Sequence, residues 1–144
     1  MQSYEELLSE SAVSVLDNEL RLCYSKLYAF DAFNKAGNKF DAGDWRMCIA
    51  YFGLGYLNSY INNRLDDNEK NIYQTTYSYA QSKFVGNIFG ESNSAFILSK
   101  CWEAINDGGE ADLFFKTGFI ASEDKNGARK HLITAFVMKY GLLT

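Results

Sequence analysis

The chain has 144 residues, of which 47% are hydrophobic and 22% charged, and its formal net charge is −4 at pH 7. This composition is close to the average of globular domains, so it excludes disorder, a fibrous repeat and a disulfide-stapled mini-protein. The length fits one domain over residues 1–144 with a single core. Because the sequence contains no proline, it can form long helices without an enforced break, and we predict an all-α fold.

The segments that would direct the chain to a membrane or out of the cell are not visible. No positively charged stretch followed by an apolar run opens the sequence, and no stretch approaches the roughly 18 apolar residues of a membrane span. The cysteines are Cys23, Cys48 and Cys101. Their odd number and wide spacing favour buried thiols over disulfides or a metal site. We therefore expect a cytoplasmic protein without a metal or cofactor.

The first helical segment is predicted over residues 4–34. Ser3 and Glu6 form the S-x-x-E pattern of a capping box, and apolar residues recur at helical spacing after it. If this helix is continuous, Glu19 projects from the middle of its apolar stripe. Alternatively, residues 17–18 cap a second helix. The sequence leaves both arrangements open.

A second helix is predicted over residues 45–64, after a turn at residues 34–38. Residues 47–57 contain no charge and are apolar on nearly every face, which is typical of a central, buried helix. Gly53 and Gly55 each cost roughly 1 kcal/mol of helix stability relative to alanine, so we expect them to allow a neighbouring helix to approach closely.

Four more helices are predicted in the rest of the chain. One opens at residues 66–69 and ends at Gly90, one covers residues 92–107, a short one covers 113–120, and the last runs from Ala128 to Tyr140, after a loop at 122–127. The residues expected on their inner faces are Tyr73, Tyr77, Ala80, Phe84, Ile88, Phe96, Ile97, Cys101, Ala104, Ile105, Leu132, Ala135 and Phe136. We expect the tyrosine hydroxyls to reach the rim of the core. Because the connections are short and no repeat is visible, we predict a single globular bundle of six or seven helices.

The sequence offers little catalytic chemistry. His131 is the single histidine, which excludes multi-histidine metal sites and two-histidine mechanisms, and we interpret it as a surface or boundary residue. The adjacent carboxylate pairs stand at predicted helix entries, where they complement the helix dipole. A cysteine–histidine pair stays open, because such partners meet in space rather than in sequence. We predict no catalytic and no metal-binding residues, and a protein that is not an enzyme.

One group of residues on the first helical segment indicates a binding surface. At 100° per residue, six acidic and tyrosine residues fall within an arc of about 60°, away from the apolar stripe. These candidate partner-binding residues are Glu6, Glu10, Asp17, Tyr24, Tyr28 and Asp31. Tyrosine rings supply contact area at a low entropic cost, and carboxylates attract a basic target. An ordinary solvated helix face is the alternative interpretation.

A small, acidic, tyrosine-rich helical protein without a catalytic set fits a stoichiometric inhibitor. Our hypothesis is a cytoplasmic immunity, or antitoxin, protein that occludes the basic active site of a partner toxin such as a nuclease. A phage-encoded inhibitor of a host nucleic-acid-handling defence complex, of the anti-CRISPR type, would use the same mechanism. A small-molecule-binding helical bundle and an uncharacterised enzyme are further alternatives. We expect no direct binding of nucleic acid, since basic residues are few, and a homodimer is compatible with each hypothesis.

Overall fold

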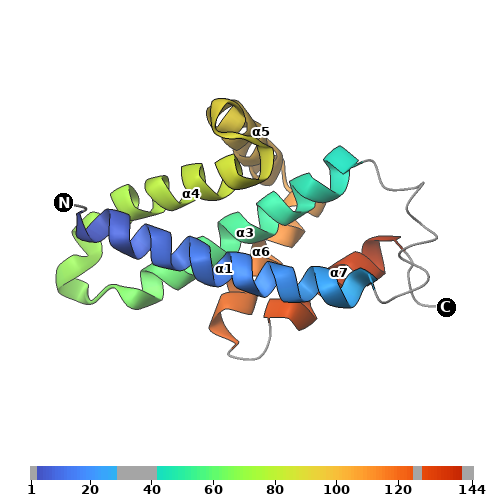
Figure 1. Ribbon diagram of the computed structural model, residues 1–144, viewed down its shortest axis with the longest axis horizontal. Helices are drawn as coiled ribbons and strands as arrows, with labels where there is room; N and C mark the ends of the chain where they lie inside the picture. Colours follow the sequence, from blue (N-terminus) through green and yellow to red (C-terminus); the bar gives the residue numbers. More distant parts are fainter. Residues whose placement is uncertain (1–2, 29–41, 125–127, 141–144) are drawn as a thin grey trace.

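The computed structural model describes residues 3–28, 42–124 and 128–140. The α-helices in these ranges are α1 (Tyr4–Tyr28), α3 (Ala42–Arg64), α4 (Tyr73–Phe89), α5 (Ser94–Asp107), α6 (Gly109–Glu123) and α7 (Ala128–Tyr140). Two short 3₁₀ helices, η2 (Asp67–Ile72) and η3 (Glu91–Asn93), precede α4 and α5. Strands are absent from the described residues, and the predicted all-α bundle of six or seven helices is confirmed (Figure 1).

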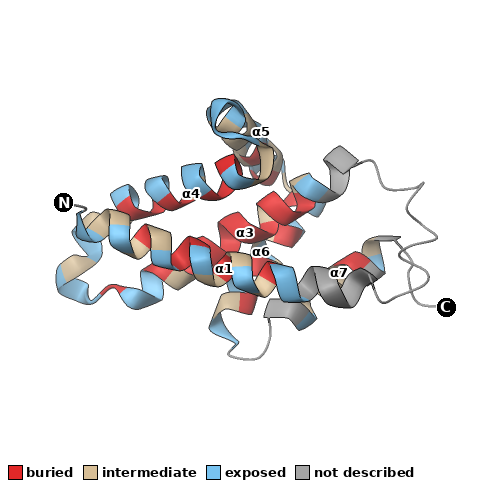
Figure 2. Cartoon of the chain, viewed as in Figure 1, coloured by how far each residue is buried: buried red, intermediate tan, exposed pale blue. Residues whose placement is uncertain are grey.

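The helices are arranged around α3. This helix contacts α1, α4, α5 and α6, with its most extensive contact along α6. α1 lies against α4 and α7, and α5 contacts both α4 and α6 (Figure 1). The buried residues line the inner faces of these helices, while α4 and α5 present exposed residues outward (Figure 2). The uncharged stretch of the second predicted helix is therefore central, as expected.

Glycines bring α3 and α6 into close contact. A Cβ atom added to Gly55 would lie 1.9 Å from the carbonyl oxygen of Phe115, and one added to Gly118 would lie 1.9 Å from the carbonyl oxygen of Phe52. Gly53 faces a side chain instead of backbone. A Cβ atom there would come within 2.1 Å of a carbon of the Phe84 ring on α4. The predicted role of Gly53 and Gly55 is confirmed. Gly118 of α6 has the same role.

α1 is one continuous helix, so the alternative of a second helix capped by residues 17–18 is wrong. At its start the Ser3 Oγ accepts a hydrogen bond from the Glu6 backbone N–H, at 3.2 Å, as the capping pattern predicts. Glu19 is only half-buried, and its carboxylate lies near Tyr56 at the edge of the apolar stripe. Burial first, and this carboxylate second, raise the pKa of Tyr56 to about 12. A helix can therefore continue through Glu19 because its charge lies at the edge of the core.

Two expectations about α5 and α6 are wrong. The side chain of Phe96 is 65% exposed rather than buried. The inward stripe of α5 runs through Ile97, Cys101 and Ile105 at a four-residue spacing, which places the preceding residue about 100° away from it. The helix predicted over residues 113–120 is also too short, since α6 extends by four residues at its start and three at its end.

An aromatic cluster joins four of the helices. The hydroxyl of Tyr77 is buried and donates a hydrogen bond to the Leu54 carbonyl oxygen at 2.7 Å, so the prediction that it reaches the rim is wrong. The Trp102 ring lies edge-on to Tyr77 at 6.3 Å and to Phe115 at 5.6 Å. Its Nε1 donates to Gln81 Oε1 at 2.9 Å. Each buried polar group in this cluster is thus paired, which fixes the packing of α3, α4, α5 and α6.

Parts of the predictions fall outside the described residues. These parts are the end of the first predicted segment at residues 29–34, the turn at 34–38 and residues 125–127 of the last predicted loop. Among the helices that the structure describes, none is long and apolar enough to cross a bilayer.

Candidate functional site

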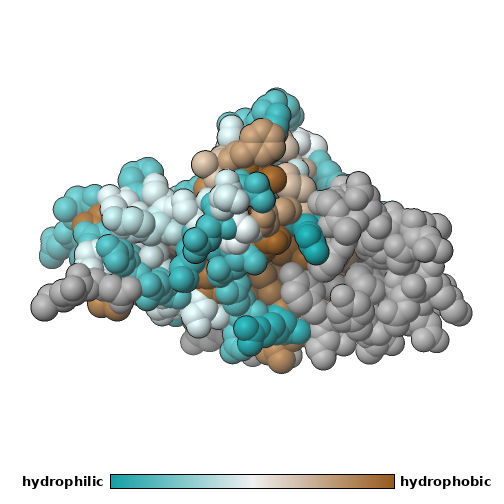
Figure 3. All heavy atoms as spheres, turned by 45° about the horizontal axis from the view of Figure 1, so that its top comes forward, coloured by the Kyte–Doolittle hydropathy of each residue, from teal (hydrophilic) through white to brown (hydrophobic). Residues whose placement is uncertain are grey.

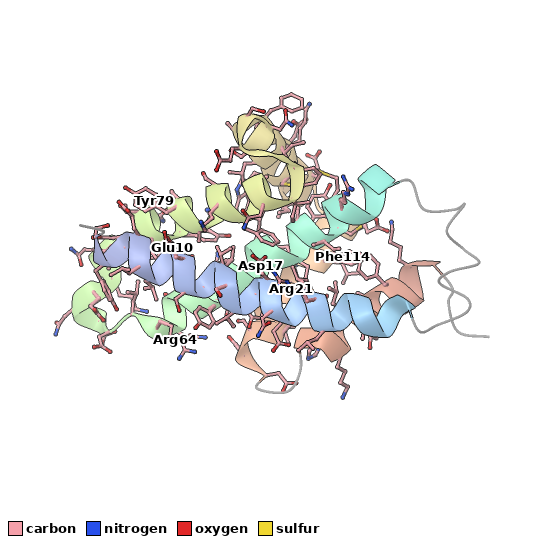
Figure 4. All side chains as sticks on the ribbon, viewed as in Figure 1. Glu10, Asp17, Arg21, Arg64, Tyr79 and Phe114 are labelled. Atoms are coloured by element: carbon pink, nitrogen blue, oxygen red, sulfur yellow. The ribbon has the colours of Figure 1, made fainter. Side chains whose placement is uncertain are left out.

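Three of the predicted partner-binding residues line one groove between α1 and α4. A hollow of about 510 Å³ is lined by Glu6 and Glu10, and a second hollow of about 330 Å³ is lined by Glu10 and Asp17. Both hollows share Lys83 and Asn87 of α4, so they form a continuous surface. We call this surface the α1–α4 groove. Figure 4 shows Glu10 and Asp17 along α1, with Tyr79 on the neighbouring α4.

Helical spacing explains how both walls of the groove form. On α1, Glu6 and Glu10 are four residues apart and Asp17 follows seven residues later, so all three share one face. On the opposite wall four residues recur every fourth position and form a ridge along α4 and into η3. They are Tyr79, Lys83, Asn87 and Glu91. The apolar stripes of the two helices pack beneath these ridges, which leaves the polar side chains above the core.

The groove carries an excess of negative charge. Four carboxylates and two cations line it, which leaves two negative charges in excess. The carboxylates are Glu6, Glu10, Asp17 and Glu91, and the cations are Arg21 and Lys83. Where α1 and α4 lie, the face in Figure 3 is mostly hydrophilic or neutral in hydropathy, while hydrophobic residues gather toward its middle. The arrangement suits a cationic partner that also forms hydrogen bonds.

Asp17 occupies an electrostatically costly position in this groove. Partial burial raises the pKa of its carboxyl group above the ordinary value, because desolvation disfavours the charged form. The Asn87 amide, whose Nδ2 lies 3.5 Å from Asp17 Oδ2, opposes this shift, as do the charges of Arg21 and Lys83. The carboxylate is therefore held by neighbours on both helices, but burial remains the larger effect on its pKa.

For the other three predicted residues, the position relative to the groove lies outside the described part of the structure. Tyr24 and Tyr28 lie in the last two turns of α1, but the positions of their side chains are outside the described part of the structure. Asp31 lies in an undescribed range of the chain.

Sequence reasoning missed the whole α4 wall. The four-residue spacing of Tyr79, Lys83, Asn87 and Glu91 is visible in the sequence and predicts an outer ridge of α4. Nothing in that spacing indicates that the ridge faces α1. The pairing of the two helices comes from their packing on α3.

The other candidate groups are dispersed. His131 is partly exposed, as predicted, and its Nε2 lies 3.4 Å from Asp124 Oδ2. Cys48 Sγ lies 3.8 Å from Glu110 Oε1, and Cys101 is a thiol whose pKa burial raises to about 12. Both of these cysteines are buried, as expected. Within the described ranges, no three histidine, cysteine or acidic side chains gather in a way that could hold a metal ion.

Comparisons with known proteins do not identify a relative, because no family model, curated protein or solved structure matches the chain.

Proposed function

We propose that the protein is a non-catalytic inhibitor that binds a basic protein through the α1–α4 groove. In the favoured form it is a cytoplasmic immunity, or antitoxin, protein that covers the active site of a partner toxin such as a nuclease. The observation that carries this proposal is the convergence of Glu6, Glu10 and Asp17 on one groove, where Glu91 adds a fourth carboxylate. A phage-encoded inhibitor of a nucleic-acid-handling defence complex would use the same groove.

The charge of the groove is complementary to that of a nucleic-acid-binding surface on a partner protein. Proteins that hold a phosphate backbone do so with clustered lysine and arginine side chains. A groove with surplus carboxylates presents charge of the same sign as phosphate, so it attracts such clusters and speeds association. Tyr79 is 44% exposed beside the acids and offers a ring and a hydroxyl to the partner. Such a ring is typical of residues that dominate binding energy.

The position of Asp17 also supports a binding role. Carboxylates whose pKa is shifted by burial cluster at functional sites more often than elsewhere. A lysine or arginine of the partner would favour the charged form of Asp17, so binding would lower the pKa of this carboxyl group. The energetic cost of its burial in the isolated protein would then be offset in the complex.

The cysteine and histidine positions favour binding over catalysis and fit a reducing compartment. The Cys101 thiol stays protonated at neutral pH because its pKa is near 12, so it is a poor nucleophile. His131 lies on α7, where its Nε2 is 3.4 Å from Asp124 Oδ2, and it is not among the residues that line the α1–α4 groove. We also propose that the protein binds no nucleic acid directly, since the surplus charge of the groove repels phosphate.

The test is a comparison of two variants with the same change in net charge. The partner is first captured by cross-linking in the native cell, and its association rate is then measured by stopped flow at low salt. The groove variant is E6Q/E10Q/D17N. The control variant, E103Q/D107N/E123Q, removes three exposed acids outside the groove.

We expect the groove variant to lower the association rate constant about tenfold, because local carboxylates steer the encounter. The control variant should change it less than twofold. Equal effects of both variants would show that only the net charge matters, and no effect of the groove variant would show that the partner binds elsewhere. Either result contradicts the proposal.

A further inference from the structure

A second groove lies between α6 and α7 and differs from the first in its chemistry. Its volume is about 590 Å³, within the range of about 300–1,000 Å³ that small-molecule sites occupy. Phe114, which is 2% exposed, and Ala135 form its floor. Leu113 on α6 and Met138 on α7 form its sides, and they are 59% and 77% exposed. The groove is therefore apolar in its middle and open to solvent.

The two ends of this groove are polar and unequal. Because α6 and α7 are antiparallel, Glu110 at the start of α6 meets Lys139 near the end of α7, and the two form an ion pair. That end therefore holds one charge of each sign. At the other end Lys130 is exposed and makes no ion pair within the described residues, and Thr134 lies one turn along α7. Among the described residues, the groove thus has an apolar trough with one cation outside any ion pair at one end.

We propose that this α6–α7 groove binds a lipophilic carboxylate with a single alkyl chain. The chain lies over Phe114 and Ala135, between Leu113 and Met138, where burial of apolar surface drives its binding. The carboxylate faces Lys130, and the Thr134 hydroxyl is positioned to donate a hydrogen bond to it. Phe114, which Figure 4 labels, is held for this role by Phe136, whose ring centroid lies 5.6 Å from that of Phe114.

The shape of the groove favours a slender ligand over a protein. The rims include the polar side chains of Thr117, Lys130 and Thr134, so a flat protein face would rest on them without reaching Phe114. An alkyl chain is thin enough to enter between the rims. The charge of Lys130 selects an anionic head over a cationic one.

The test uses decanoate and 1-decanol as probes, which share an alkyl chain and differ in charge. Binding to the full chain is measured by isothermal titration calorimetry below the micelle-forming concentration. The variants are L113D, which places a charge beside the tail, and K130Q, which removes the cation. The controls are I120D, at an Ile that is 54% exposed on α6 outside the groove, and K116Q, at a lysine that pairs with Asp112 instead.

We expect both probes to bind with one site per chain, and decanoate more tightly. L113D should abolish the binding of both probes, and I120D should leave it unchanged. K130Q should weaken decanoate about two- to fivefold, the size of an exposed ion pair, and leave 1-decanol unchanged. K116Q should affect neither probe.

Four results would overturn the proposal. The first is no saturable binding of decanoate, and the second is equal binding to the L113D and wild-type chains. The third is a dimer in light scattering that dissociates in L113D, because a second copy would then occupy the groove. If decanoate binds but K130Q has no effect, the groove does not select a carboxylate and the proposed ligand class is wrong.

Discussion

Asp17 occupies a position that costs the fold stability, and under the proposed function it would serve binding in return. Its carboxyl group is partly buried between α1 and α4, and desolvation is the largest of the effects on its pKa, which is raised. The folded state therefore binds a proton on Asp17 more tightly than the unfolded state does. By linkage, ionised Asp17 destabilises the fold at every pH above its raised pKa, and this penalty disappears as the pH falls below the ordinary value of 3.8.

We predict that Asp17→Asn stabilises the fold at pH 7 by no more than about 1 kcal/mol, because solvent screens a half-exposed carboxyl group. Asparagine removes the charge and can still accept the hydrogen bond from the Asn87 amide. The difference in the free energy of unfolding between the variant and the wild type should shrink as the pH is lowered through the raised pKa of Asp17. Urea unfolding of the variant and the wild type between pH 7 and pH 3 measures this difference.

Glu103→Gln serves as the control, since Glu103 lies on an exposed face of α5 and its weak contact with Lys100 spans 3.9 Å. This substitution should not raise the free energy of unfolding as Asp17→Asn does. If Asp17→Asn destabilised the protein at pH 7, the carboxylate would be a net stabilising group and our account of its burial would be wrong.

At the scale of helices, the contact between α3 and α6 depends on reciprocal glycines. Gly55 of α3 faces the backbone of α6, and Gly118 of α6 faces the backbone of α3. Backbone cannot rotate away as a side chain can, so a methyl group at either position must push the helices apart. The α3–α6 contact also positions the walls of both grooves, because α1 and α4 pack against α3 while α7 packs against α6.

We predict that Gly118→Ala lowers the free energy of unfolding by about 1–3 kcal/mol, the usual cost of overpacking. Gly86→Ala is the matched control, because the nearest atom to a Cβ there is 3.6 Å away, which is an ordinary contact. It should be neutral or stabilise the protein by up to about 1 kcal/mol, through higher helix propensity. Urea unfolding compares the two variants. Equal costs would mean that the α3–α6 contact is not as close as the structure has it.

The positions of the helices could be predicted from the sequence, and their packing only in part. The spacing of apolar residues placed α7 at the bounds it has, and Gly53 and Gly55 indicated a close neighbour. Phe96 was misplaced because hydrophobicity alone does not decide burial, and its ring instead lies 5.6 Å from the Lys100 Nζ. The length of α6 was underestimated because its first turn contains Glu110 and Asp112, which suit a helix start but break the apolar pattern.

At the scale of the whole molecule, the candidate site is made by two helices that are distant in the sequence. The acids of α1 could be assigned to one face from their spacing alone, and Glu6, Glu10 and Asp17 do line one groove. The opposite wall could not be predicted, because its position depends on how α1 and α4 both pack on α3. For the same reason the apolar α6–α7 groove could not be predicted from the sequence. Leu113 and Met138 come together only because α6 and α7 pack against each other.

We propose that a basic partner covers the α1–α4 groove. Carboxyl footprinting by carbodiimide coupling, read by mass spectrometry with and without the captured partner, tests it most directly. We predict that Glu6, Glu10, Asp17 and Glu91 lose reactivity in the complex, whereas Glu103 and Glu123 keep theirs. Unchanged reactivity along the groove, with protection of acids elsewhere on the bundle, would contradict the account.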